Sequence, residues 1–93
     1  VTDATFKEAV RLLSVLPEEM PAPEISPAPI GQIGFEWNEG KGQSVVVTVS
    51  GRGRIVYSAL WPRGASTRGI EPFSVELPRQ VKDLLARLYE TGR

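Results

Sequence analysis

Apolar residues recur at helical spacing near both ends of the chain, and they alternate with polar residues through its middle. Near the N-terminus, residues 3–16 predict an amphipathic helix. Its expected buried face is made of Phe6, Ala9, Val10, Leu13 and Leu16, and Lys7, Glu8, Arg11 and Ser14 lie largely opposite. We expect Asp3 or Thr5 to cap this helix, and we expect it to end near Val15 because Pro17 cannot continue it.

Residues 17–29 contain five prolines and favour an extended, polyproline-like conformation. Because this segment also carries Met20 and Ile25, we interpret it as a strap anchored across the domain. A flexible linker is the alternative, but a single-domain chain has no second domain to link.

Three strands are predicted next, over residues 30–38, 44–50 and 54–61, with glycine-rich turns between them. They form a three-stranded antiparallel meander. A five-residue first loop would pair Trp37 with Val45 and Phe35 with Val47, which places both apolar sets on one face. A four-residue loop would pair Phe35 with Val46 and separate the sets, so side-chain parity favours the odd loop.

The chain after the meander is expected to be a polar loop over residues 62–69 and then a short fourth strand or extended arm in which Phe73, Val75 and Leu77 alternate. Pro78 suits the first turn of a C-terminal helix that Gly92 would close. The apolar stripe of this helix is Val81, Leu84, Leu85 and Leu88.

These elements predict an α+β fold, in which both helices cover one face of the sheet in a two-layer sandwich. The 93 residues fit a single domain, 1–93. The predicted helix-covered face carries Phe35, Trp37, Val45, Val47, Val49, Ile55 and Tyr57. The opposite face is mixed and contains Glu36, so the strap, another subunit or a partner could cover it.

The composition narrows the chemistry that the chain can perform. It has no cysteine and no histidine, which excludes disulfides, thiolate metal sites and catalytic triads built on either residue. We therefore expect no catalytic residues, no metal site and no cofactor. A small carboxylate-dependent enzyme that relies on Glu36 or Tyr57 is the minor alternative.

The net charge is zero, and no apolar run approaches the roughly 20 residues of a membrane-spanning helix. We therefore expect no membrane segment and a cytoplasmic location. The charges are unevenly distributed, because every charge between residues 13 and 39 is acidic and every charge between residues 41 and 70 is basic.

The candidate partner-binding residues are Arg52, Arg54, Trp61, Arg63, Arg68 and Glu36. Arginines among glycines and hydroxyl residues can hold carboxylate or phosphate groups, and Trp61 could stack on a base. Alternatively, Trp61 is a core residue and the arginines solubilise the surface or pair with the acidic strap. The four arginines would form one basic patch only if the chain bends, because a straight third strand separates them into two groups.

One resemblance rests on the proline-rich run from Leu16-Pro17 to Ser26-Pro27, the sequence Gly34-Phe35-Glu36-Trp37, and Ile55-Val56-Tyr57-Ser58. With these features, the chain resembles small uncharacterised bacterial proteins from mobile and accessory regions of genomes. The resemblance covers most of the chain and implies an accessory role without any assigned activity.

Taken together, these observations favour a non-enzymatic protein-interaction module, such as an antitoxin, an inhibitor or an anti-defence factor, that docks through the sheet and its charged rim. Its expected partner is another protein. The alternative is a nucleic-acid-associated module that uses the arginine-rich loops, whose binding would weaken steeply with salt.

Overall fold

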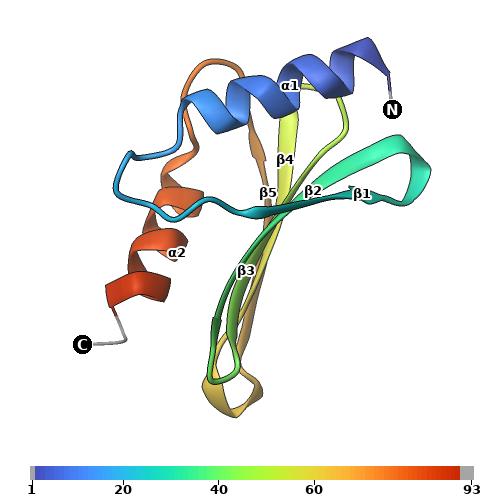
Figure 1. The fold of residues 1–93 in the computed structure, drawn as a ribbon. Coiled ribbons are helices and arrows are strands. Elements are labelled where there is room, and N and C mark those ends of the chain that lie inside the picture. Colours follow the sequence, from blue (N-terminus) through green and yellow to red (C-terminus); the bar gives the residue numbers. More distant parts are fainter. Residues whose placement is uncertain (1, 91–93) are drawn as a thin grey trace.

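A five-stranded antiparallel sheet and two helices make up the chain, which the computed structural model describes from residue 2 to residue 90 (Figure 1). The strands lie in the sheet in chain order. The elements are α1 (Asp3–Ser14), β1 (Glu24–Ala28), β2 (Gln32–Gly40), β3 (Gln43–Val49), β4 (Arg54–Leu60), β5 (Ser66–Pro72) and α2 (Arg79–Glu90). Single 3-10 turns at Pro29–Gly31 and Pro62–Gly64 precede β2 and β5. The α+β prediction is confirmed, whereas the three- or four-stranded sheet is corrected to five strands.

The predicted register of the meander is confirmed. Trp37 lies opposite Val45, Phe35 opposite Val47, and Val47 opposite Tyr57. In the first hairpin, five residues separate the paired residues Asn38 and Ser44, as the prediction requires. They include a two-residue turn and a register shift between Asn38 and Gly40. The turn residues Lys41 and Gly42 have φ values of 56° and 80°, as a type I′ turn requires.

The strap contributes a strand that the sequence analysis did not predict. Residues of β1 pair antiparallel with β2, so that Glu24 lies opposite Glu36 and Ile25 opposite Phe35. Pro27 is compatible with this pairing because β1 is an edge strand, where a missing N–H can face solvent. The strap is anchored as expected through Met20, which packs against the core, but Ile25 remains 51% exposed.

The last strand lies earlier in the chain than the prediction placed it. β5 occupies Ser66–Pro72, most of which was expected to be loop, and residues 73–77 form no strand. Phe73 and Leu77 are buried, but Val75 is 71% exposed, so these three residues do not share a face. A glycine in β5 explains the missed pattern, because Gly69 lies under the ring of Tyr57 on the neighbouring strand.

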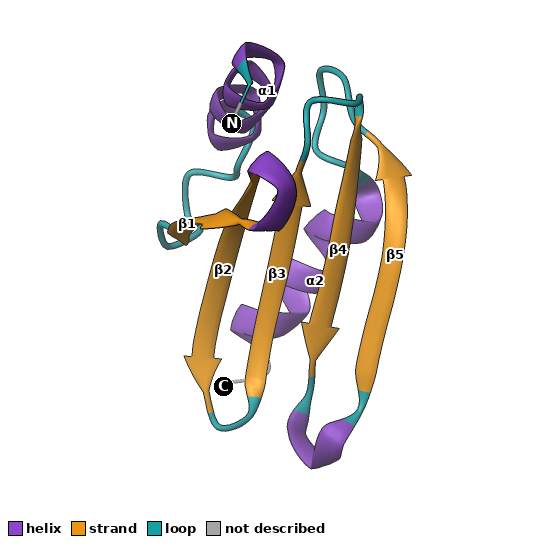
Figure 2. Cartoon of the chain, turned by 90° about the vertical axis from the view of Figure 1, so that its right-hand side faces the viewer, coloured by secondary structure: helices purple, strands orange, loops and turns teal. Residues whose placement is uncertain are grey.

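The core lies between the helices and one face of the sheet, in agreement with the two-layer prediction. Every residue of the predicted helix-covered face is buried, and so is the stripe Val81, Leu84, Leu85 and Leu88 of α2. In the view turned by 90°, the strands lie in front of α2, and of the helical segments only the short 3-10 turn at Pro29–Gly31 projects in front of them (Figure 2). Gly92, the expected C-terminal stop of α2, lies outside the described residues.

Candidate functional site

The setting of α1 against the sheet depends on a buried carboxylate. Glu8 is only 6% exposed, and its two carboxylate oxygens accept hydrogen bonds from the backbone N–H groups of Gly51 and Gly53, at 2.9 and 2.8 Å. These donors belong to the hairpin between β3 and β4, which passes beside α1 (Figure 1). The placement of Glu8 on the polar, outward side of the helix was therefore wrong.

Close packing at Gly51 also supports the contact between α1 and the hairpin that joins β3 and β4. A Cβ atom on this residue would lie 2.7 Å from the backbone nitrogen of Thr5, nearer than real Cβ atoms come to other atoms. Gly51 also has a φ of 80°, which favours glycine. The hairpin thus approaches the helix backbone directly, while the side chain of Thr2 caps the helix by accepting a hydrogen bond from the Thr5 N–H group.

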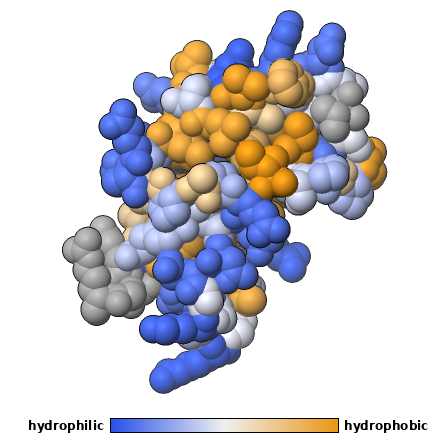
Figure 3. Space-filling view, viewed as in Figure 1, coloured by the Kyte–Doolittle hydropathy of each residue, from blue (hydrophilic) through white to orange (hydrophobic). Residues whose placement is uncertain are grey.

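Because Glu8 points inward, the apolar stripe of α1 points away from the core. The buried face consists of Thr5, Glu8, Ala9 and Leu12. Phe6, Val10 and Leu13, which the sequence assigned to the core, are 62%, 49% and 41% exposed. In the space-filling view, hydrophobic residues gather in the upper part of the molecule, over α1 and the strap below it (Figure 3).

A shallow groove runs along the outer side of α1. Phe6, Val10 and Ser14 line it together with two basic side chains, Lys7 and Arg11. All five residues are exposed, and neither base forms an ion pair within residues 2–90. The groove therefore combines an apolar floor with unpaired positive charge. We call Phe6, Lys7, Val10, Arg11 and Leu13 the α1 surface.

The predicted basic residues do not form one patch. Arg52 lies in the turn before β4 and Arg54 is the first residue of β4. Both line a hollow of about 210 Å³ whose other lining residues are Ile30, Gln32, Ser50 and Val56. Arg63 lies in the turn after β4, at the opposite end of a seven-residue strand that spans roughly 20 Å. The basic groups are therefore separate, as the straight-strand alternative predicts.

Trp61 is placed in the core rather than on the surface. Its side chain is 3% exposed, and its indole N–H group donates a hydrogen bond to the Thr67 hydroxyl at 3.3 Å. The guanidinium carbon of Arg87 lies 4.0 Å from the ring centroid, in a cation-π contact. Trp61 thus presents no free ring face on which a base could stack.

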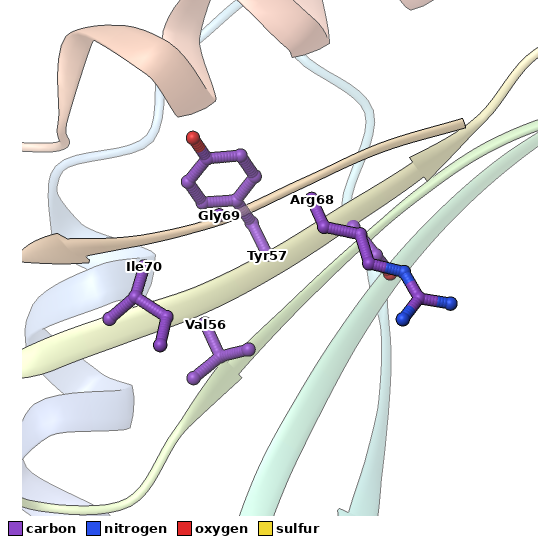
Figure 4. A pocket seen from close by; sticks show the side chains of 6 residues that line it. Val56, Tyr57, Arg68, Gly69 and Ile70 are labelled. Carbon is purple, nitrogen blue, oxygen red and sulfur yellow. The ribbon is translucent and has the colours of Figure 1, made fainter. Parts of the chain in front are cut away.

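Glu36 and Arg68 lie on the face of the sheet that no helix covers. Both are exposed, and Arg68 borders a shallow hollow of about 550 Å³ with Val56, Ser58 and Ile70 (Figure 4). Tyr57, the other residue considered for catalysis, points to the opposite side of the sheet in this view. The two candidates for a small enzyme, Glu36 and Tyr57, therefore face different layers.

Residues 2–90 contain no group of three or more Asp, Glu, His or Cys side chains arranged to hold a metal ion. Within the same residues, neither helix has the length and apolar character needed to cross a membrane.

The surroundings of Tyr89 perturb its pKa. Partial burial of the Tyr89 ring at the end of α2 raises the pKa of its phenol above the usual 10.0, and the nearby Glu39 carboxylate raises it further. Both effects favour the neutral phenol. Tyr89 therefore stays protonated to a higher pH than an exposed tyrosine.

Comparisons of the chain with protein-family models, with curated proteins and with solved structures give no match.

The α1 surface could not be predicted from hydrophobicity, because α1 carries two stripes at helical spacing and the less hydrophobic one is buried. Thr5, Glu8 and Leu12 also recur at helical spacing, but a charged residue in their middle argued against burial. The glycine-rich tip at residues 51–53 was the available signal, because its N–H groups need an acceptor that Glu8 provides.

Proposed function

We propose that the chain is a non-enzymatic protein-interaction module whose partner binds the α1 surface. The observation that carries this proposal is the outward orientation of Phe6, Val10 and Leu13 on a helix whose opposite side is fixed to the sheet. Three apolar side chains at i, i+4 and i+7 form the pattern by which one helix docks against another. The partner element is accordingly an amphipathic helix.

The charge of the groove specifies the partner further. Lys7 and Arg11 stand one turn apart beside the apolar stripe, and both are exposed. Acidic residues flanking the apolar face of the partner helix would complement them, which speeds association and fixes the register of docking. We therefore propose a partner segment with an apolar stripe and flanking Glu or Asp residues.

The wider role we propose is that of a cytoplasmic accessory protein, such as an antitoxin, an inhibitor or an anti-defence factor. The absence of cysteine and histidine supports a role without catalysis. The resemblance to small bacterial accessory proteins points the same way. Burial of Trp61 weakens the nucleic-acid alternative, since its ring was the predicted stacking platform.

A designed peptide tests the α1 surface directly. The probe is a helical peptide with leucines at i, i+3, i+4 and i+7 and glutamates flanking them, and a second peptide carries lysines in place of the glutamates. Fluorescence anisotropy should show that the acidic peptide binds at least about tenfold more tightly than the basic one. Added salt should reduce the difference, because both basic side chains are exposed.

Matched substitutions locate the binding site. Val10→Glu should weaken binding of the acidic peptide at least about tenfold, whereas Val75→Glu, which changes another exposed valine outside α1, should leave it unchanged. Equal binding of both peptides, or equal loss in both variants, would contradict the proposal. Thermal denaturation of each variant shows whether its fold is retained.

The hollow beside Arg52 and Arg54 supports one competing function, the binding of nucleic-acid phosphates. Salt-dependent binding to mixed DNA and RNA measures it, because each phosphate contact steepens the dependence of affinity on salt. Tight, strongly salt-dependent binding that Arg52→Glu with Arg54→Glu abolishes would favour this function over the α1 surface.

A further inference from the structure

The hollow beside Arg52 and Arg54 lies at one end of the sheet face opposite the core. Its volume is about 210 Å³, and we call it the arginine hollow after its lining residues Ile30, Gln32, Ser50, Arg52, Arg54 and Val56. In Figure 2 the 3-10 turn at Pro29–Gly31 projects in front of the strands. The sheet therefore forms the floor of the arginine hollow, and this turn forms one of its walls.

The register of the sheet places polar side chains side by side on that floor. Val49 pairs with Ile33 of β2 on one side and with Ile55 of β4 on the other. All three of these side chains point toward the core, so the side chains of their chain neighbours point to the opposite face. Those neighbours form one row across the strands: Gln32, Ser50 and Arg54. The row therefore offers an amide, a hydroxyl and a guanidinium group.

Two guanidinium groups make the arginine hollow positive. Arg54 belongs to the row on the floor, and Arg52 extends from the turn before β4. Both side chains are exposed, and neither forms an ion pair within residues 2–90. A guanidinium group donates two parallel hydrogen bonds to a carboxylate or a phosphate. The charge therefore indicates an anionic ligand group.

The remaining two lining residues are aliphatic. Val56 is 45% exposed, and Ile30 is 95% exposed. Ile30 lies in the three-residue connection between the paired residues Ala28 and Gln32, where its φ is 62°. A β-branched residue is rare in this left-handed conformation, which glycine and asparagine adopt at lower cost. Neither burial nor backbone conformation therefore accounts for an isoleucine at this position, whereas contact with a ligand would.

We propose that the arginine hollow binds the C-terminal carboxylate of a peptide chain whose last residue is aliphatic. The carboxylate contacts Arg52 and Arg54, and the last side chain packs against Ile30 and Val56. Sites for drug-sized ligands begin near roughly 300 Å³, so a hollow of about 210 Å³ suits a single residue. A chain end fits such a space because nothing follows its carboxylate.

The aliphatic lining favours a peptide end over a nucleic-acid phosphate. The arginines alone do not discriminate, since they hold both kinds of anion. Contact with Ile30 and Val56 adds to affinity only when the ligand carries an apolar group beside its anionic group. A residue such as leucine at a chain end has both groups, whereas a phosphodiester would leave the two aliphatic side chains in water.

Fluorescence anisotropy with short peptides tests the proposal. The probe is a flexible peptide of glycine and serine, labelled at its N-terminus, that ends in leucine with a free carboxylate. The same peptide with a C-terminal amide should bind at least about tenfold more weakly, because it loses the charge-assisted hydrogen bonds. A peptide that ends in glycine should bind at least about fivefold more weakly, because it leaves Ile30 and Val56 uncovered.

Neutral substitutions locate the carboxylate. Arg52→Gln combined with Arg54→Gln should weaken binding of the leucine peptide at least about tenfold. Arg79→Gln combined with Lys82→Gln is the matched control, because it removes two positive charges from exposed side chains of α2. This control should leave binding unchanged, and thermal denaturation checks that both double variants are folded.

A variant of the turn tests the apolar contact. Ile30→Gly removes the aliphatic side chain, and glycine accepts a φ of 62° without strain, so the fold should be retained. The variant should reduce the preference for leucine over glycine at least about twofold. Its preference for a free carboxylate over an amide should remain, because both arginines are still present.

Equal binding of the carboxylate and amide peptides would overturn the proposal, and so would the absence of leucine-peptide binding up to about 1 mM. Equal binding of the leucine and glycine peptides would also overturn it, because the arginine hollow would then be a general anion site open to nucleic-acid phosphates. The proposal is independent of the α1 surface. A glycine-serine peptide carries no helical apolar stripe, so its failure to bind would not count against the proposed partner helix.

Discussion

Replacement of Glu8 by alanine should destabilise the protein far more than replacement of an ordinary helix-surface glutamate. The substitution removes both carboxylate oxygens and leaves the N–H groups of Gly51 and Gly53 without their partner. A hydrogen bond to a charged group contributes about 1.5 to 3 kcal/mol. Two such bonds, taken at the lower end, contribute about 3 kcal/mol, and the gain from the higher helix propensity of alanine is small beside this loss.

A loss of about 3 kcal/mol is a large fraction of the stability of a domain this small, which is typically about 5 to 15 kcal/mol. It corresponds to a decrease in Tm of roughly 12 to 24 °C. Glu8→Gln retains one acceptor oxygen but turns an amide N–H toward the second backbone donor, so we expect about half of the loss. The expected order of stability is therefore wild type, Glu8→Gln and then Glu8→Ala.

Urea denaturation followed by circular dichroism measures these differences. Glu19→Ala is the matched control, because Glu19 is exposed in the strap and its loss should change the free energy of unfolding by less than about 0.5 kcal/mol. If Glu8→Ala cost no more than Glu19→Ala, the two hydrogen bonds would not determine the setting of α1. The outward orientation of Phe6 and Val10 would then need another cause.

Two further predictions concern the hairpin and the end of α2. Gly51→Ala should lower the free energy of unfolding by at least about 1 kcal/mol more than Gly64→Ala, because both residues have a φ of 80° but only Gly51 contacts α1; equal losses would show that backbone strain alone matters. Because the pKa of Tyr89 is raised in the folded protein, the unfolded chain loses this proton first as the pH rises above 10.0, and stability should fall there. Chemical denaturation should show a shallower alkaline decline for Tyr89→Phe than for wild type, and identical slopes would exclude a contribution from this phenol.

The meander formed by β2, β3 and β4 could be predicted from the sequence because the alternation of apolar and polar residues that specifies it lies within each strand. Side chains alternate with a period of two, so a shift of one residue would have exposed the whole apolar set of Phe35, Trp37 and their partners on β3. The alternation of side chains therefore determines which residues of neighbouring strands can pair, whatever the exact geometry of the turn. The stripe of α2 was equally clear, since Val81, Leu84, Leu85 and Leu88 are all apolar and all buried.

The edge strands and the setting of α1 depend on contacts between distant residues. β1 pairs through backbone groups despite Pro27, and β5 includes Gly69, whose missing side chain is compensated by Tyr57 from β4. Neither strand shows the alternation that identifies a half-buried strand. The orientation of α1 is determined by two N–H groups that lie 43 and 45 residues further along the chain than Glu8. The spacing of apolar residues within the helix gives no information about such a distant contact.

Glu8 connects the fold to the proposed partner site. Its carboxylate fixes α1 through the N–H groups of Gly51 and Gly53. It thereby keeps exposed an apolar stripe, with Phe6 and Val10, that hydrophobic burial alone would have turned toward the core.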